Sequence, residues 1–178
     1  MINGFRRTAV AAVSVLALGA GGAAWAASSA SASSAAPAAV AACPASHLAV
    51  WVNADSADGT AGTTYFTLDY TNTSRTTCFL FGYPGVSATT LAGAQIGKAA
   101  TRNNSTPARA IDLAPGATAH SNLGYHDILI EPSCKERTAA FLKVYAPNDT
   151  VAKHAFFSLT MCATGQSDLS VSRVQAGA

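Results

Sequence analysis

One stretch of the chain decides the fold: residues 64–72 read TYFTLDYTN. Apolar side chains alternate here with polar or threonine side chains, so that Phe66, Leu68 and Tyr70 fall on one face of an extended chain. Residues 47–53, HLAVWVN, repeat the pattern closer to the N-terminus. Alternation with a period of two residues is typical of a strand that is buried on one side. These two segments therefore predict half-buried β-strands.

Further strand-like segments follow along the chain, and turns separate them. Two of the turns contain Pro84-Gly85 and Pro115-Gly116, and each pair suits a type II turn with glycine at the second central position. About eight or nine short strands at this spacing predict an all-β fold, an antiparallel two-sheet β-sandwich, with a closed barrel as the lesser alternative. The segments expected after residue 72 are 77–81, 86–90, a hairpin at 91–97, 110–113, 118–127, 139–145, 155–162 and 169–174.

The charge of the chain is low and balanced. Charged residues make up 11% of the 178 residues, less than half of the roughly 25% typical of soluble domains. The formal net charge of +2 comes from Arg6 and Arg7, because the other nine basic residues balance the nine acidic ones. The length fits one domain with or without tails, and the composition excludes a coiled coil and a highly charged nucleic-acid binder. It gives no electrostatic reason to bind nucleic acid or anionic lipid.

The first 26 residues have the features of an export signal. Arg6 and Arg7 precede an apolar run of small residues at 9–24, and Ala24-Trp25-Ala26 supplies a cleavage site of the A-x-A type. The run is too short and too rich in glycine to favour a membrane anchor. Residues 1–26 are therefore expected to be a cleaved secretory signal peptide. The residues that flank Arg6-Arg7 lack the rest of the twin-arginine pattern, which favours the general secretory route. The mature protein is expected outside the cell, free or associated with the cell wall, without a membrane span.

Residues 27–42 are small, uncharged and without periodicity, rich in alanine and serine with one proline. Such a segment buries too little apolar area to offset its ordering entropy, so it is expected to be a flexible linker before a domain at 43–178. The lesser alternative is a lipoprotein cleavage box at Val40-Ala41-Ala42-Cys43, which would place a lipid on Cys43. That alternative requires the box to follow the apolar run directly, and it would leave one other cysteine unpaired.

Four cysteines lie in the exported part: Cys43, Cys78, Cys134 and Cys162. An even number of cysteines outside the cytosol predicts disulfides, and the absence of a C-x-x-C pair argues against a zinc knuckle or a redox site. Three pairings are possible. Cys43–Cys78 with Cys134–Cys162 is favoured, because each bond then ties segments that are near one another in a meandering chain.

The sequence also resembles a known family. Residues 78–86, CFLFGYPGV, follow the pattern C-x-L-x-G-Y-P-G-V, and residues 113–116, LAPG, and 142–147, LKVYAP, come in the same order. The chain from Cys43 to Val174 thereby resembles a family of secreted domains of unknown function from actinobacteria, the high-GC Gram-positive bacteria. The resemblance implies an immunoglobulin-like sandwich in the cell envelope or the medium and brings no catalytic residues. Phe79 and Phe81 depart from it, since such domains often carry polar residues there.

No pattern in the sequence indicates a catalytic residue, a cofactor or a metal. The motifs G-x-S-x-G and H-E-x-x-H are absent, as is a P-loop. His120 and His126 would share one face of a strand but lie about 20 Å apart, too far to bind one ion. Glu131 and Glu136 flank Cys134 in a loop, where solvated charge is expected. We therefore expect no enzyme activity, although a Ser-His-Asp arrangement assembled by the fold is left open.

Three aromatic residues are candidates for a binding surface. The alternation turns Trp51 away from its apolar neighbours, and Tyr65 is expected beside it on the next strand. Tyr83 is expected at the tip of the turn at 82–85. Aromatic side chains often anchor interfaces. The alternatives for Trp51 are that the linker or a loop covers it or that both faces of its strand are buried. The alternative for Tyr83 is that it packs back onto the sandwich.

These features predict a secreted, non-enzymatic β-sandwich that binds a cell-envelope polymer or an extracellular protein. The alternative is a secreted inhibitor of proteases or hydrolases, or an unrecognised extracellular hydrolase. In the inhibitor alternative, the polar loop Thr101–Pro107 would enter a protease cleft. Retention of the protein on cells distinguishes the two hypotheses, because a wall binder stays with the cells and a diffusible inhibitor enters the medium.

Overall fold

Strands build the molecule, as the alternation predicts. The structure is a computed structural model that describes residues 39–60, 62–126 and 133–177. These residues form thirteen strands and one 3-10 turn, η1 (Ala45–His47). The strands are β1 (Ala41–Ala42), β2 (Leu48–Thr60), β3 (Thr63–Asn72), β4 (Cys78–Phe81), β5 (Gly85–Thr89), β6 (Gln95–Ile96), β7 (Thr101–Arg102), β8 (Ala110–Leu113), β9 (Thr118–His126), β10 (Glu136–Tyr145), β11 (Ala152–Cys162), β12 (Leu169–Val171) and β13 (Gln175–Ala176).

Hydrogen bonds join the strands into three sheets. The six-stranded sheet has the order β2-β3-β9-β12-β7, with β13 also paired to β9. The four-stranded sheet has the order β11-β10-β5-β6, and a small sheet has the order β1-β4-β8. Pairing is antiparallel except between β1 and β4 and between β12 and β7. The all-β, largely antiparallel fold is confirmed, with more strands than expected and with a third sheet.

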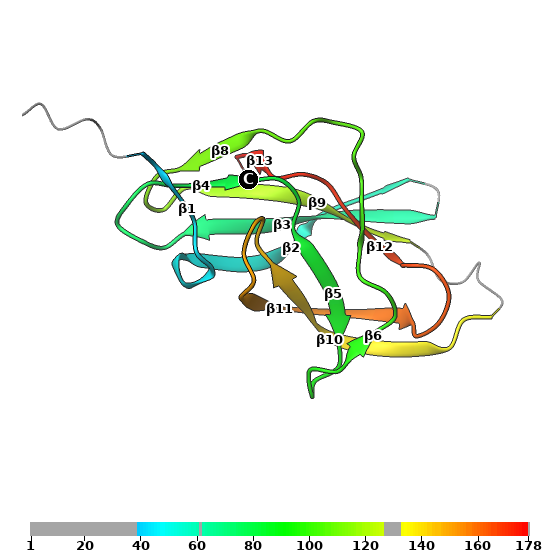
Figure 1. Cartoon of the computed structure of the whole chain (residues 1–178). Helices are drawn as coiled ribbons and strands as arrows, with labels where there is room; N and C mark the ends of the chain where they lie inside the picture. Colours follow the sequence, from blue (N-terminus) through cyan, green and yellow to red (C-terminus); the bar gives the residue numbers. More distant parts are fainter. Residues whose placement is uncertain (1–38, 61, 127–132, 178) are drawn as a thin grey trace, which may run out of the picture. The chain divides into compact units, whose positions relative to one another are not determined.

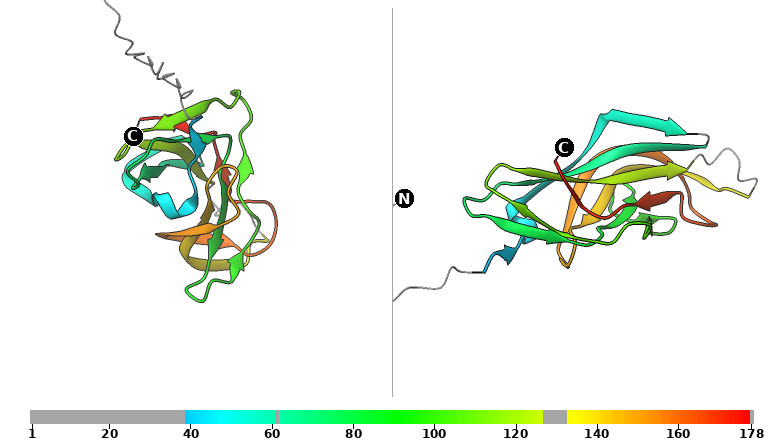
Figure 2. Two further views of the ribbon diagram at one scale, coloured as in Figure 1. Left: turned by 60° about the vertical axis from the view of Figure 1, so that its left-hand side comes forward. Right: turned by 90° about the horizontal axis from the view of Figure 1, so that it is seen from above.

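One hydrophobic core lies between the two larger sheets (Figures 1 and 2), which gives the arrangement its sandwich character. Leu68 of β3 and Leu123 of β9 contribute to it from the six-stranded sheet, and Leu142 and Val144 of β10 contribute from the four-stranded sheet. All four side chains are buried, as the period-two pattern requires. The opposite faces of the same strands are thereby turned away from the core.

The predicted disulfide pairing is confirmed. Cys43 bonds to Cys78, and Cys134 bonds to Cys162, with Cα–Cα distances of 4.9 and 5.1 Å. The Cys43 sulfur is therefore engaged in a disulfide, whereas lipidation would require the same atom. Just before it, Ala41 and Ala42 form β1 against β4, so the last residues assigned to the linker belong to a sheet.

The expected signal peptide at 1–26 and most of the linker at 27–42 lie outside the described residues. No helix among the residues that the structure describes is long and apolar enough to cross a membrane.

The two proline–glycine turns differ. At Pro115-Gly116, Gly116 has φ 77°, and Ala117 N–H donates to the Ala114 carbonyl oxygen over 2.9 Å, as a type II turn requires. The type II prediction at Pro84-Gly85 is wrong, because Gly85 is already the first residue of β5, paired with Tyr145 of β10. A Cβ on Gly85 would lie 3.5 Å from the Tyr145 side chain. The positive φ falls on Gly82 instead, at 111°.

Candidate binding site

The outer face of the six-stranded sheet, the face turned away from the core, carries the predicted aromatic residues. Residues paired across antiparallel strands point to the same side of a sheet. Three neighbouring rows cross β2, β3 and β9 on this face. They are Trp51–Asp69–His120, Asn53–Thr67–Asn122 and Asp58–Tyr65–Gly124. A row of two amides and a hydroxyl thus lies between a row with tryptophan and a row with tyrosine.

Trp51 and Tyr65 are partly open to solvent. Trp51 is 41% exposed and Tyr65 is 39% exposed, and no described segment covers either of them completely. Their rows are four residues apart along β3, which corresponds to about 13 Å. The spacing leaves room for a ligand to touch the polar row and both aromatic side chains at once.

The Tyr65 ring lies over a glycine on the neighbouring strand, where a larger residue would not fit. Gly124 of β9 pairs directly with Tyr65. A Cβ on Gly124 would lie 3.0 Å from Cε1 of Tyr65 and 2.5 Å from Oγ of Ser170. Glycine therefore lets the ring lie across β9, beside the polar row.

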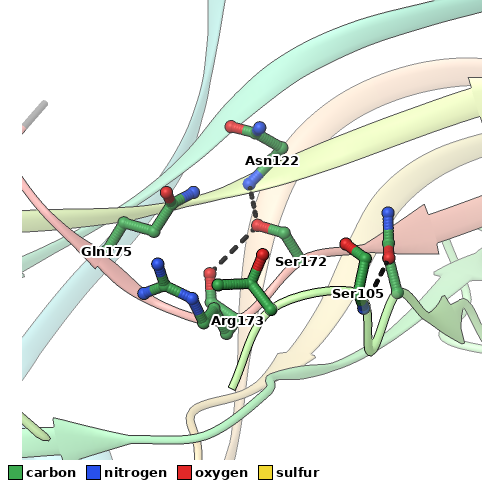
Figure 3. A pocket seen from close by; sticks show the side chains of 7 residues that line it. Ser105, Asn122, Ser172, Arg173 and Gln175 are labelled. Atoms are coloured by element: carbon green, nitrogen blue, oxygen red, sulfur yellow. Dashed lines mark hydrogen bonds between the residues drawn. The ribbon is translucent and has the colours of Figure 1, made fainter. Parts of the chain in front are cut away.

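A pocket of about 170 Å³ opens where the polar row reaches β9 (Figure 3). We call it the Arg173 pocket. Its wall comes from four places in the fold: the loop after β7, the strand β9, the segment that joins β12 to β13, and the strand β13. The lining residues are Asn103, Ser105, Thr106, Asn122, Ser172, Arg173 and Gln175.

Backbone-directed hydrogen bonds fix the wall of the Arg173 pocket. Ser172 Oγ accepts from the Asn122 N–H over 2.8 Å and donates to the Arg173 carbonyl oxygen over 3.0 Å (Figure 3). Asn103 N–H donates to the Val171 carbonyl oxygen over 2.8 Å, and Ser105 N–H donates to Asn103 Oδ1 over 3.1 Å. The pocket is thus held by its own frame, which lowers the entropy cost of binding.

Tyr83 supports this frame and is not at the tip of a turn. The side chain is half-buried, and its hydroxyl donates to the Thr106 carbonyl oxygen over 2.9 Å. Thr106 lies in the pocket wall, 23 residues further along the chain. Of the two sequence alternatives for Tyr83, the structure matches packing back onto the sandwich.

Several polar groups of the Arg173 pocket have hydrogen-bonding capacity to spare. The side-chain amides of Asn122 and Gln175 form no hydrogen bond with any described residue, and neither do the hydroxyls of Ser105 and Thr106. Amides supply both donors and acceptors, and hydroxyls do the same. A ligand rich in hydroxyl groups would satisfy them.

A second depression, of about 290 Å³, adjoins the first. Its lining residues are Ser56, Asp58, Tyr65, Phe66, Thr67 and Asn122. Asn122 lines both depressions, so they meet at this residue. We call the two depressions together the outer groove. It follows the polar row from the Arg173 pocket to Tyr65.

Asp69 lies buried in the row of Trp51, although its position in the alternation suggests an exposed side chain. It is only 2% exposed, and its Oδ1 has no hydrogen-bond partner. Burial raises the pKa of the Asp69 carboxyl, while a hydrogen bond from Thr67 and the charge of His120 partly oppose that rise. Its neighbours cover Asp69, so it is not a contact point for ligand.

The histidines are engaged separately. His126 Nδ1 lies 2.9 Å from the Thr63 hydroxyl, and His120 Nδ1 contacts the Gly177 carbonyl oxygen. Within 39–60, 62–126 and 133–177, no three His, Cys, Asp or Glu side chains gather as a metal site would require. Glu131 lies outside these ranges.

No sequence pattern singled out Arg173 or Gln175 as site residues, and Asn122 was expected only as one polar residue of a strand. The single usable signal was the polar composition of Thr101–Pro107, whose Asn103, Ser105 and Thr106 line the pocket. The other residues come together only through the pairing of β9 with β12 and β13.

Comparison with known proteins gives the chain a family. Residues 43–178 match the family model described as "Domain of unknown function (DUF4232)". The chain belongs to the DUF4232 family. The DUF4232 domain begins at Cys43, the first cysteine of the first disulfide, and contains the whole outer groove. No curated protein and no solved structure matches the chain.

Proposed function

We propose that this DUF4232 domain is a secreted, non-enzymatic binding module whose outer groove holds a cell-envelope polysaccharide. One observation supports it above the others. The Arg173 pocket holds amides and hydroxyls with spare hydrogen-bonding capacity, and its Asn122 lies in the row between those of two partly exposed aromatic side chains, Trp51 and Tyr65. A sugar ring presents hydroxyls at its edge and C–H groups on its faces, which suit polar groups and aromatic rings respectively.

The polar character of the groove favours a polysaccharide over a protein as the partner. The fully buried centre of a protein–protein interface is usually depleted in charge and rich in apolar groups. Thr67 and Asn122 of the polar row line the middle of the outer groove instead. A polysaccharide presents hydroxyls and C–H faces at every sugar unit. A shallow groove can therefore gain affinity by contacting several units along the polymer rather than by enclosing one unit deeply.

Location outside the cell is supported by two features. Both disulfides need an oxidising compartment to persist, and residues 1–26 have the composition of a signal peptide. A module that binds the envelope needs export and little else, since sugar binding by amides, hydroxyls and aromatic rings requires no cofactor.

The proposal is tested by co-sedimentation of the purified, oxidised protein with isolated cell-wall material. Trp51→Ala is expected to weaken binding about tenfold or more, as loss of an aromatic anchor does. Phe156→Ala is the matched control, because Phe156 is an aromatic residue that is 76% exposed and belongs to the other large sheet. It is expected to bind as the wild type does.

Melting curves of both variants check that they remain folded. Failure of the wild type to pellet with walls would contradict the proposal, and so would equal pelleting of wild type and Trp51→Ala. In a culture, release of the protein into the medium without retention on cells would favour the diffusible inhibitor instead.

A further inference from the structure

Arg173 has no acidic partner among the residues that the structure describes. Arg173 is the one charged residue among those that line the pocket. Its Nη1 donates to the Val174 carbonyl oxygen over 3.3 Å, and its Nε is buried without any hydrogen-bond partner. No carboxylate in the described part of the chain forms an ion pair with it. A guanidinium is thus held at the wall of a polar pocket without a counter-charge.

Such an arrangement is costly unless something compensates for it. Arginine stays protonated in proteins, so it cannot relieve burial by losing its proton. A partly desolvated cation without a counter-ion weakens the folded state, and an anion in the pocket would remove that cost. A cation without an acidic partner in an otherwise neutral pocket therefore indicates an anionic ligand.

The neutral groups around Arg173 are placed to complete an anion site. Gln175 lies near the guanidinium in Figure 3, and Asn122 lines the same pocket from β9, with its side-chain amide directed away from Arg173. Their side-chain amides are hydrogen-bond donors that form no bond with the described residues. One planar cation with flanking neutral donors matches an anion of single charge whose two oxygens lie in a plane.

We infer that the Arg173 pocket is a subsite for the carboxylate of an acidic sugar in the bound polysaccharide. The inference rests on the proposed function and adds the class of sugar. The carboxylate pairs with the Arg173 guanidinium, the amide of Gln175 binds its outer lone pairs, and the amide of Asn122 binds hydroxyls further along the sugar. The volume of about 170 Å³ suits one substituted sugar unit, while the rest of the polymer follows the groove toward Tyr65.

The test compares one polysaccharide in two chemical forms. Wall polysaccharide is freed of its peptides with an amidase, and half of it is carboxyl-reduced, which turns each carboxylate into a primary alcohol. Removal of the peptides eliminates their carboxylates as a source of binding, and reduction leaves phosphodiesters intact. Binding of the wild type, Arg173→Gln, Arg173→Lys and Arg75→Gln to both forms is then measured. Arg75 is an exposed arginine in the turn between β3 and β4 and serves as the matched control.

We expect reduction of the polymer to weaken binding by the wild type and by Arg75→Gln about tenfold. Arg173→Gln is expected to bind the native polymer about as weakly as the wild type binds the reduced polymer. Its affinity is expected to stay the same when the polymer is reduced. Arg173→Lys keeps the charge without the planar fork and is expected to fall between them. It also serves as the second variant if Arg173→Gln fails to fold.

Each other outcome overturns a different claim. If reduction leaves wild-type binding unchanged, the polysaccharide module stands and the carboxylate subsite is wrong. If reduction weakens the wild type and Arg173→Gln by the same factor, the carboxylate is bound elsewhere and the assignment to Arg173 is wrong. If the wild type binds neither form, the proposed function fails and the subsite fails with it.

Discussion

At the scale of single residues, side chains on neighbouring positions of the same strand have opposite roles. Leu68 and Tyr70 are buried in the core, whereas Tyr65 and Thr67 face the outer groove. The alternation predicts this division correctly because the period of a strand depends on backbone geometry alone. Asp69 is the exception, since its burial results from side chains on the adjacent strands. Cross-strand neighbours cannot be read from one segment of sequence.

Asp149 gives a prediction at this scale. Its Oδ1 accepts from the Val151 N–H over 2.8 Å, and its Oδ2 accepts from the Ala45 N–H at the start of η1. The Val151 N–H contributes most to lowering the pKa of the Asp149 carboxyl, burial opposes it, and the Ala45 N–H adds to the lowering. Because the folded pKa lies below the ordinary value of 3.8, the carboxylate stabilises the fold above that pH.

This stabilisation is lost as the pH falls through the lowered pKa. Asp149→Asn is therefore expected to reduce the free energy of unfolding at pH 7 by up to about 1 kcal/mol, limited by solvent screening, and to have little effect near pH 2. Urea unfolding at both pH values measures the difference. Asp112→Asn, at an exposed position of β8, is the control. Equal destabilisation at both pH values would show that the charge of Asp149 does not matter.

At the scale of elements, long strands were predictable and short ones were not. The segments expected at 47–53 and 64–72 correspond to β2 and β3, although β2 continues to Thr60. The strands β1, β6, β7 and β13 have two residues each, too few to show alternation. They exist because tertiary packing brings a partner alongside, as β12 does for β7. The binding site depends on these short elements, so most of it was hidden from sequence reasoning.

The loop after β7 gives a prediction at the scale of elements. Tyr83→Phe removes the hydroxyl that binds the Thr106 carbonyl oxygen, and Thr106 is exposed, so that water replaces the lost donor. The free energy of unfolding is expected to fall by less than about 1 kcal/mol. Binding to wall polysaccharide is expected to weaken a few fold, because the loop must then be ordered on binding.

Tyr145→Phe is the matched control, since Tyr145 lies on β10 in the other large sheet. Binding assays and melting curves on both variants decide the matter. Unchanged binding in Tyr83→Phe would mean that the Thr106 wall of the Arg173 pocket does not contact the ligand.

At the scale of the whole molecule, one sandwich presents two different outer surfaces. The outer face of the six-stranded sheet is polar with isolated aromatic rings, whereas β10 and β11 place Phe141 against Phe156 on the four-stranded sheet, with ring centroids 5.5 Å apart. The overall class was predictable from composition, alternation and cysteine count. The division into three sheets was not, because it depends on long-range pairing.

The disulfides are expected to hold this small molecule together. Removal of Cys43–Cys78 by a double substitution to alanine frees a loop that spans 35 residues of sequence. The chain-entropy model gives a loss of about 4 kcal/mol in the free energy of unfolding, a large share of the stability of a typical domain. Urea unfolding of the variant against the oxidised wild type measures it. A loss below about 1 kcal/mol would show that strand pairing alone fixes β1 and η1.

Tryptophan fluorescence shows whether a polysaccharide lies on Trp51. The chain has two tryptophans, and Trp25 falls in the expected signal peptide, so in the protein without residues 1–26 the emission reports Trp51 alone. Titration with peptide-free wall polysaccharide is expected to shift the emission to shorter wavelength and to saturate, because the sugar excludes water from the indole. An emission spectrum that stays constant while the same protein pellets with the walls would contradict a binding role of Trp51, since binding would then take place away from this side chain.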